Sequence, residues 1–120
     1  MDPISRVVAA GAAGAGAAGA ALYVDDVFST YLYDGTGAAQ TITNGIDLSG
    51  EGGLVWIKER DSADSHALFD TERGVQKYLK SDAVDGQYTR TDALSAFNSD
   101  GFSFNGAFGA ANQSSKTYAS

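Results

Sequence analysis

The sequence predicts an all-β domain of antiparallel strands, preceded by an N-terminal arm rich in alanine and glycine. Beyond residue 22, apolar and polar residues alternate with a period of two, which is typical of strands with one buried face. Turn residues separate these runs at short intervals, and no run has a helical period of convincing length. Many short strands between regular turns are typical of an antiparallel β-sandwich or barrel.

The arm comprises residues 1–22, and residues 9–21 are alanine and glycine without exception. Asp2 and Pro3 form a good helix start, but each glycine weakens a helix by about 1 kcal/mol relative to alanine. We therefore expect the arm to be partly helical or extended, and to become ordered against a partner that its small side chains allow to approach closely. The residues expected to contact that partner are Ile4, Val7, Val8, Gly11, Gly14, Gly16 and Gly19.

Three other interpretations of the arm each lack a physical requirement. A signal peptide has a basic start and a strongly apolar run, whereas Arg6 is balanced by Asp2. A membrane span needs about 20 strongly apolar residues, so we expect no membrane insertion. Residues 14–19 match the G-x-G-x-x-G pattern of dinucleotide-binding folds, with Asp34 at a suitable spacing. That pattern requires an amphipathic helix after the last glycine, and the sequence there is strand-like instead.

The first half of the domain contains four strand-like runs. Residues 27–33 alternate strictly, and residues 54–60 form the clearest strand of the chain. Asn44-Gly45 is a strong hairpin turn and predicts that residues 40–43 pair with residues 46–48.

The second half repeats this pattern. Residues 66–70 return from a polar turn, and residues 75–80 form a further expected strand ahead of a polar stretch. Residues 94–98 and 102–104, joined by Ser99-Asp100-Gly101, predict a hairpin, and residues 116–119 have strand character.

Composition limits the classes of partner. The chain has 120 residues and a formal net charge of −7, so we expect one domain plus the arm and no nucleic-acid partner, because phosphate recognition needs a basic face. It has no cysteine, which rules out disulfides and thiolate metal sites.

Residues suited to catalysis are few. His66 is the only histidine, so any triad would depend on it, and we expect no catalytic residue. We expect no cofactor; the acidic turns suit calcium best, although none fits the D-x-[DN]-x-[DN]-G loop. Asn112 begins a glycosylation sequon of a kind that is common by chance. Paired acids that could cleave a glycoside are Asp25 and Asp26, Asp61 and Asp64, Asp70 and Glu72, and Asp82 and Asp85.

Trp56 suggests a binding site. It shares a strand face with Leu54 and Lys58, and if this face is exposed, the indole could stack on a sugar or contact a protein. Tyr31 and Tyr33 offer a second stacking face. The alternative, which we favour, places Trp56 over the core near the buried start of its strand.

Four segments of the chain resemble a known family: residues 27–33, 45–58, 70–74 and 97–102. Together with the Asp2-Pro3-Ile4 start and the small-residue tract, they are similar to the N-terminal region of tail fibre and tail appendage proteins of marine, cyanophage-like bacteriophages. This resemblance implies a concanavalin-like, jelly-roll β-sandwich over residues 23–120, and it implies no catalytic residue. In relatives the strand near the end leads into further modules, so we expect this domain to be truncated at its C-terminal side.

The resemblance also implies a function. We expect a structural virion protein, made in the bacterial host cytoplasm, that docks on other tail proteins through its arm, forms a homo-oligomer (a trimer is favoured) and supports host attachment. The alternative is a carbohydrate-binding, lectin-like module that recognises host surface glycans through Trp56, Tyr31 or Tyr33. A glycan-degrading enzyme is a distant third.

Overall fold

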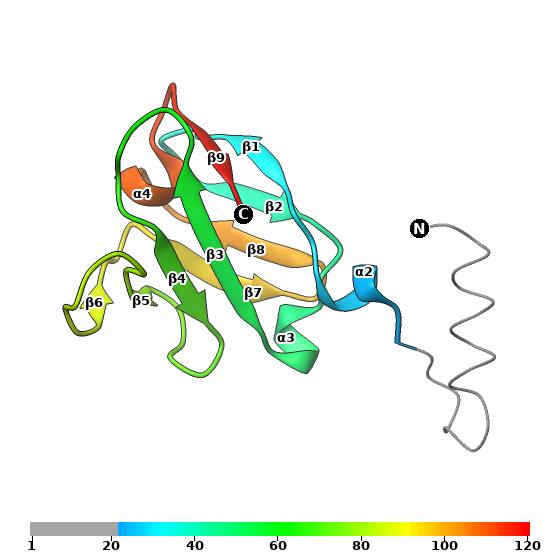
Figure 1. The fold of residues 1–120 in the computed structure, drawn as a ribbon. Coiled ribbons are helices and arrows are strands. Elements are labelled where there is room, and N and C mark those ends of the chain that lie inside the picture. The colour runs from blue at the N-terminus through cyan, green and yellow to red at the C-terminus, as the bar shows by residue number, and fades with distance from the viewer. Residues whose placement is uncertain (1–21) are drawn as a thin grey trace, which may run out of the picture.

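The computed structural model describes residues 22–120 of the chain, and this part consists mainly of short strands (Figure 1). The helices in it are one turn each: α2 (Val24–Val27), α3 (Leu48–Glu51) and α4 (Gly109–Asn112). The strands are β1 (Leu32–Asp34), β2 (Gln40–Thr43), β3 (Leu54–Glu59), β4 (Ala67–Asp70), β5 (Lys77–Tyr78), β6 (Tyr88–Thr89), β7 (Leu94–Asn98), β8 (Gly101–Phe104) and β9 (Thr117–Ala119).

All pairings between these strands are antiparallel. One sheet has the order β1-β9-β3-β4, a second has the order β2-β8-β7, and β5 pairs with β6. The predicted all-β, antiparallel fold is therefore confirmed for residues 22–120, as is the expectation that this part contains no long helix.

The last strand of the chain lies inside a sheet. β9 is inserted between β1 and β3, with Tyr118 opposite both Tyr33 and Glu59 (Figure 1). The strand character predicted for residues 116–119 is thus confirmed, and this short strand joins the two ends of the described chain.

Two predicted hairpins are also confirmed. β3 and β4 pair across the polar turn of residues 60–66, and β7 and β8 pair across Ser99-Asp100. At the start of β8, Gly101 has a φ of 156°, and a Cβ there would collide with the carbonyl oxygen of Ile42 on β2. The second hairpin therefore requires glycine at this position.

The first predicted strand, residues 27–33, is confirmed only in part: its last residues pair with β9 from Tyr31 on, whereas Val27 lies in α2 and residues 28–30 belong to no helix or strand. Residues 24–27 form α2 instead, where the Asp26 carboxylate accepts a hydrogen bond from the Tyr23 backbone N–H at 3.1 Å. Such a local bond satisfies a helix start and competes with strand pairing. Regular β1 begins only at Leu32.

The hairpin predicted at Asn44-Gly45 is wrong as well. The backbone N–H groups of Asn44 and Gly45 both donate to the Asp100 carbonyl, so this turn contacts the β7–β8 turn. β2 accordingly pairs with β8, and the expected strand at residues 46–48 is replaced by the start of α3, which the Asp47 side chain caps. The Asn44-Gly45 dipeptide thus predicts the turn correctly, but it does not predict which strand pairs with β2.

The strand predicted at residues 75–80 is reduced to β5, and the polar stretch after it contains β6. A further bridge joins Leu79 to Leu68 of β4. β5 and β6 therefore attach to the free side of β4 (Figure 1).

The two larger sheets contribute to one hydrophobic core. It includes Ile57 and Phe69 from one sheet and Phe102 and Phe104 from the other, all nearly without exposed surface. The Tyr33 ring lies 5.9 Å from that of Phe104, between ring centroids, and so connects the sheets.

Two polar side chains are buried with this core, Glu59 and Asn112. The Glu59 carboxylate accepts a hydrogen bond from the Ser62 hydroxyl at 2.7 Å and lies 3.7 Å from the Lys116 ammonium group. The buried charge is thus compensated on the edge where β3 meets the segment before β9.

Among residues 22–120, no helix is both long enough and apolar enough to cross a membrane.

Candidate functional site: an apolar slot beside strand β3

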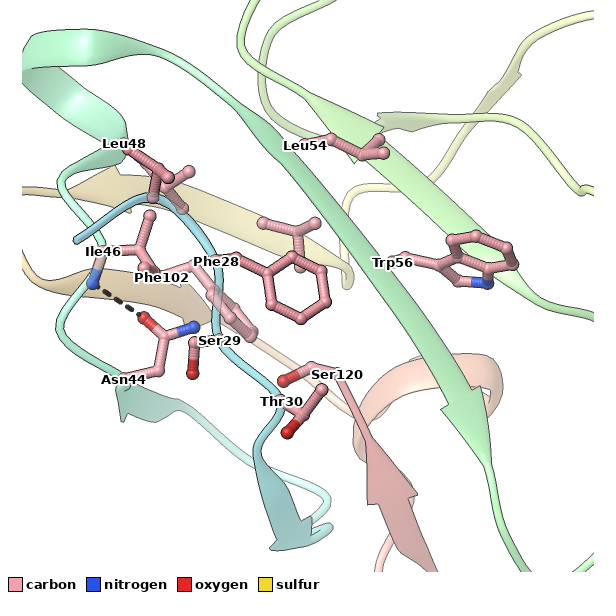
Figure 2. A pocket seen from close by; sticks show the side chains of 12 residues that line it. Phe28, Ser29, Thr30, Asn44, Ile46, Leu48, Leu54, Trp56, Phe102 and Ser120 are labelled. Atoms are coloured by element: carbon pink, nitrogen blue, oxygen red, sulfur yellow. Dashed lines mark hydrogen bonds between the residues drawn. The ribbon is translucent and has the colours of Figure 1, made fainter. Parts of the chain in front are cut away.

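An open cavity of about 390 Å³ lies between the first half of β3 and the segment of residues 27–30 (Figure 2). We call it the slot. Its lining comes from both larger sheets and the loops at their ends, and comprises Val27, Phe28, Ser29, Thr30, Asn44, Ile46, Leu48, Leu54, Val55, Trp56, Phe102 and Ser120.

One side of the slot is an unpaired stretch of strand edge. Arg60 donates its backbone N–H to the Thr117 carbonyl at 2.7 Å, and the pairing with β9 stops at Lys58. Because backbone groups of alternate residues point to the same side of a strand, those of Trp56 and Leu54 face the slot. No strand among residues 22–120 pairs with them on this side.

The opposite side is also extended backbone. Tyr31 and Ser120 exchange two backbone hydrogen bonds, at 2.9 and 2.8 Å, and so continue the pairing of β1 with β9 by one residue. By the same alternation, the backbone groups of Ser29 face the slot. Phe28 is extended, with φ −145° and ψ 132°. The slot therefore has the position of a strand that would prolong β9 between its two neighbours.

The bottom of the slot is apolar. It consists of core residues, among them Phe102, Val55 and Leu48, with Ile46 partly buried beside them. The Asn44 side-chain oxygen accepts from the Ile46 backbone N–H at 3.2 Å, which holds this loop in place (Figure 2).

Large apolar side chains surround the opening. Phe28 is 65% exposed, Leu54 57% and Trp56 52%, and all three line the slot. In Figure 2 the Phe28 ring lies between its own segment and β3. We call the side chains of Phe28, Leu54 and Trp56 the apolar rim. A cluster of this kind is typical of a surface that contacts another molecule.

Trp56 is on the outside of the sheet, so the favoured prediction that it covers the core is wrong. Val55 and Ile57 are the core-facing residues of β3, and the face that holds Leu54 and Lys58 is the outer one. The apolar side chains of Leu54 and Trp56 at the start of β3 therefore lie on this outer face and are exposed. The alternative interpretation, an exposed Trp56, describes the observed geometry.

The indole of Trp56 has a polar neighbour. Its Nε1–H donates to His66 Nδ1 at 2.8 Å, with the rings edge to face and their centroids 5.7 Å apart. Burial raises the pKa of the nearby Asp82 carboxyl, but hydrogen bonds, including one from Ser65, and the charge of His66 outweigh it, so this pKa lies below its usual value. The hydrogen bond to His66 holds the indole in one orientation, with its outer surface exposed.

The second predicted stacking face, formed by Tyr31 and Tyr33 together, is not present on the surface. Tyr33 is buried, 8% exposed, and its hydroxyl donates to the Ala111 carbonyl at 2.8 Å. Burial raises the pKa of Tyr33 above its usual value. Tyr31 is exposed at the end of β1, but Tyr33 has no free ring face for a sugar and is not a candidate.

The remaining predictions concern the arm residues, metal binding and glycosylation. The arm residues Ile4, Val7, Val8, Gly11, Gly14, Gly16 and Gly19 lie outside the described residues. Within residues 22–120, no group of three or more His, Cys, Asp or Glu is placed to hold a metal ion. Asn112 is fully buried, so its amide is not accessible for glycosylation in the folded domain.

Sequence reasoning missed the slot itself. Its signal was present in the outward positions of two runs, Phe28 in one and Leu54 and Trp56 in the other, where a soluble sheet usually has polar residues. Both sides of the slot come from segments far apart in the chain, so the local pattern could not place them together.

The fold and the slot define a class: a small antiparallel β domain with an apolar, strand-shaped opening between two of its strands. Residues 24–120 match the family model described as "Domain of unknown function (DUF7483)", and the chain belongs to this family. Neither the curated proteins nor the solved structures include a significant match to it.

Proposed function

We propose that this protein is a structural protein of a bacteriophage virion, the anchoring N-terminal part of a tail fibre or related appendage. The observation that supports this most directly is the apolar rim around the slot, since a surface of large exposed apolar side chains suits permanent assembly. The arm joins the described domain at Leu22, close in sequence to Val27 and Phe28 of the slot. In this proposal the arm docks on the tail and the β domain supports host attachment.

The proposal includes the finer architecture. The two larger sheets are taken as the layers of a concanavalin-like, jelly-roll sandwich, which the single core shared by β1, β3, β8 and β9 supports. The assembled form is taken as a homo-oligomer, with a trimer favoured, located in the phage tail. The acidic balance of −7 agrees with protein partners rather than nucleic acid.

Deletion of residues 1–21 tests the docking role in particles of the phage that encodes the chain. We expect the truncated protein to be absent from purified virions while its domain remains folded by circular dichroism. A matched control replaces Val84, a fully exposed side chain, with alanine, and this variant should be incorporated normally. Particles that still contain the truncated protein would contradict the proposal.

A carbohydrate-binding module is the second candidate, and the exposed indole of Trp56 favours it. Sugars stack on aromatic faces, and the nearby Lys58 and His66 supply polar groups. A glycan array with the purified protein should then give hits that Trp56→Ala loses and Val84→Ala keeps. Absence of binding to all host polysaccharides would remove this candidate.

We propose no enzymatic activity. The single histidine supports this, because His66 Nδ1 already accepts a hydrogen bond from Trp56 and so is not free to act as a base at that atom. An assay for hydrolysis of host polysaccharides tests it, and a rate that falls in His66→Gln would contradict it.

A further inference from the structure

We propose that His66 is a pH-sensitive switch that sets the orientation of the Trp56 indole: the neutral imidazole holds the indole by a hydrogen bond, and the protonated imidazole releases it. Both rings lie on the outer face of the sheet that contains β3 and β4. The switch is independent of the proposed function, because it needs only these two side chains and their neighbours in the same domain.

The hydrogen bond exists only while the imidazole is neutral. The Trp56 Nε1–H can only donate, and its acceptor, His66 Nδ1, lies 2.8 Å away. A neutral imidazole has one acceptor nitrogen, whereas an imidazolium has an N–H on both nitrogens and no acceptor. A flip of the charged ring therefore restores nothing, and protonation of His66 replaces the hydrogen bond by two opposed N–H groups.

The β3–β4 pairing brings the two rings together without help from the hydrogen bond. Trp56 lies opposite Leu68, and His66 is two residues before Leu68 on the same face. Diagonal neighbours of this kind are within reach of aromatic side chains, and these two rings meet edge to face. The inner face of both strands is held by buried Ile57 and Phe69. Loss of the bond therefore frees the indole and leaves the backbone in place.

A carboxylate lies beside the imidazole. Asp82, in the exposed loop after β5, accepts hydrogen bonds from the Ser65 side chain and from the backbone of His66. Burial raises the pKa of Asp82, but hydrogen bonds and the charge of His66 outweigh it and lower this pKa. Asp82 is therefore ionised at neutral pH, and its charge stabilises the imidazolium that has lost its bond to Trp56.

The remaining charged groups near His66 are Lys58, Lys80 and Asp64. Lys58 donates to two backbone carbonyls, one at the end of β3 and one in the turn after it, at 2.6 and 2.9 Å. The Lys80 ammonium group lies 4.4 Å from the centre of the Tyr88 ring. Asp64 is two residues before His66 in the same turn. Both ammonium groups are thus engaged by other atoms, and the carboxylates on either side favour the imidazolium.

The switch operates in the range where histidine side chains ordinarily change charge, between about pH 5 and pH 8. At the upper end the indole is fixed against His66. At the lower end its Nε1–H bonds to water, and the ring, which is 52% exposed, is free to turn. The Trp56 part of the apolar rim therefore has an ordered and a mobile form, and the proton on His66 selects between them.

Nuclear magnetic resonance of the full chain tests the switch without ambiguity, because the chain has one tryptophan and one histidine. The indole Nε1–H signal and the imidazole signals are followed from about pH 5 to pH 8 in one sample. As the imidazole gains its proton, we expect the indole proton signal to move upfield with the same midpoint. The order parameter of the Nε1–H bond should fall at the same time, because the ring becomes mobile.

Two variants complete the experiment. His66→Gln removes the titrating group and offers an amide oxygen as acceptor, so its indole signal should stay constant over this range. Val84→Ala, in the same loop as Asp82, should behave like the parent. An indole signal that stays constant while the imidazole titrates, a shift without a fall in the order parameter, or an equal shift in His66→Gln would each overturn the inference.

Discussion

Asn112 on α4 connects two loops through one buried side chain. Its amide nitrogen donates to the carbonyls of Ala38 and Gly106, at 2.6 and 2.9 Å, and its oxygen accepts from the Thr36 backbone N–H at 3.0 Å. Asn112 itself has no exposed surface, and its three hydrogen bonds are partly buried. The side chain therefore acts as a fixed spacer between the β1–β2 loop and α4.

Asn112→Asp tests this role with nearly the same volume. The carboxylate has no donor for the two carbonyls and is a buried charge, so we expect a loss of about 3 kcal/mol or more in the free energy of unfolding. Urea denaturation followed by circular dichroism measures it. Asn105→Asp makes the same change at an exposed site and should have little effect, and equal effects of the two variants would contradict this prediction.

A second residue, Asp61, tests how the stability of the domain depends on pH. Its carboxylate accepts hydrogen bonds from the backbone N–H and the hydroxyl of Thr117, at 2.6 and 3.0 Å, and these bonds lower its pKa below the usual 3.8. A carboxyl group whose pKa is lower in the folded than in the unfolded state stabilises the fold at pH values above its unfolded-state pKa. This contribution is lost as the pH falls through the folded-state pKa.

Asp61→Asn should therefore reduce the free energy of unfolding at pH 7 more than at pH 3. Urea denaturation at both pH values gives the comparison. Glu72→Gln removes the same charge at an exposed position and serves as the control. An Asp61→Asn effect that does not change between pH 7 and pH 3 would show that the carboxylate charge has no part in holding β9.

At the scale of elements, the β7–β8 hairpin depends on its first β8 residue. Gly101 combines a φ of 156° with close contact to the Ile42 backbone, so a side chain there would separate β8 from β2. We expect Gly101→Ala to destabilise the domain by about 3 kcal/mol or more, which is in the range of backbone strain plus a lost pairing.

Gly86→Ala is the matched control for this change. A Cβ at Gly86 would contact nothing within 4 Å, so this variant should be neutral or slightly stabilising. Melting temperatures of both variants check the pair of predictions. Similar melting temperatures for Gly101→Ala and the parent would mean that the two strands can separate at this point without loss.

At the scale of the whole molecule, residues 22–120 contain a hydrophobic core of their own. Its buried residues extend from Tyr33 to Tyr118, and both larger sheets are made within this part. A protein that lacks residues 1–21 should therefore unfold cooperatively with a free energy within about 1 kcal/mol of the full chain when both are compared as monomers. Urea denaturation at low protein concentration measures this, and loss of the cooperative transition would contradict it.

Much of the secondary structure could be predicted because it depends on local pattern. The strands at residues 54–59 and 67–70 and the hairpin around Ser99-Asp100 follow from alternation and turn residues, which are properties of neighbouring positions. The candidate site could be predicted only in part. The exposure of Trp56 agrees with the alternative interpretation and not with the favoured one, and the stacking role of Tyr33 is wrong because its alternation with Tyr31 does not reveal which face is covered.

The class of this domain follows from local sequence features: it is an acidic, all-β chain of antiparallel strands with short turns, preceded by an arm of small residues. These features depend on side-chain period and composition, which need no knowledge of distant contacts. The position of β9 between β1 and β3 is a property of the tertiary structure, because it depends on contacts between segments that are far apart in the chain. The slot and the exposure of Trp56 follow from that, because they depend on which distant segments become neighbours.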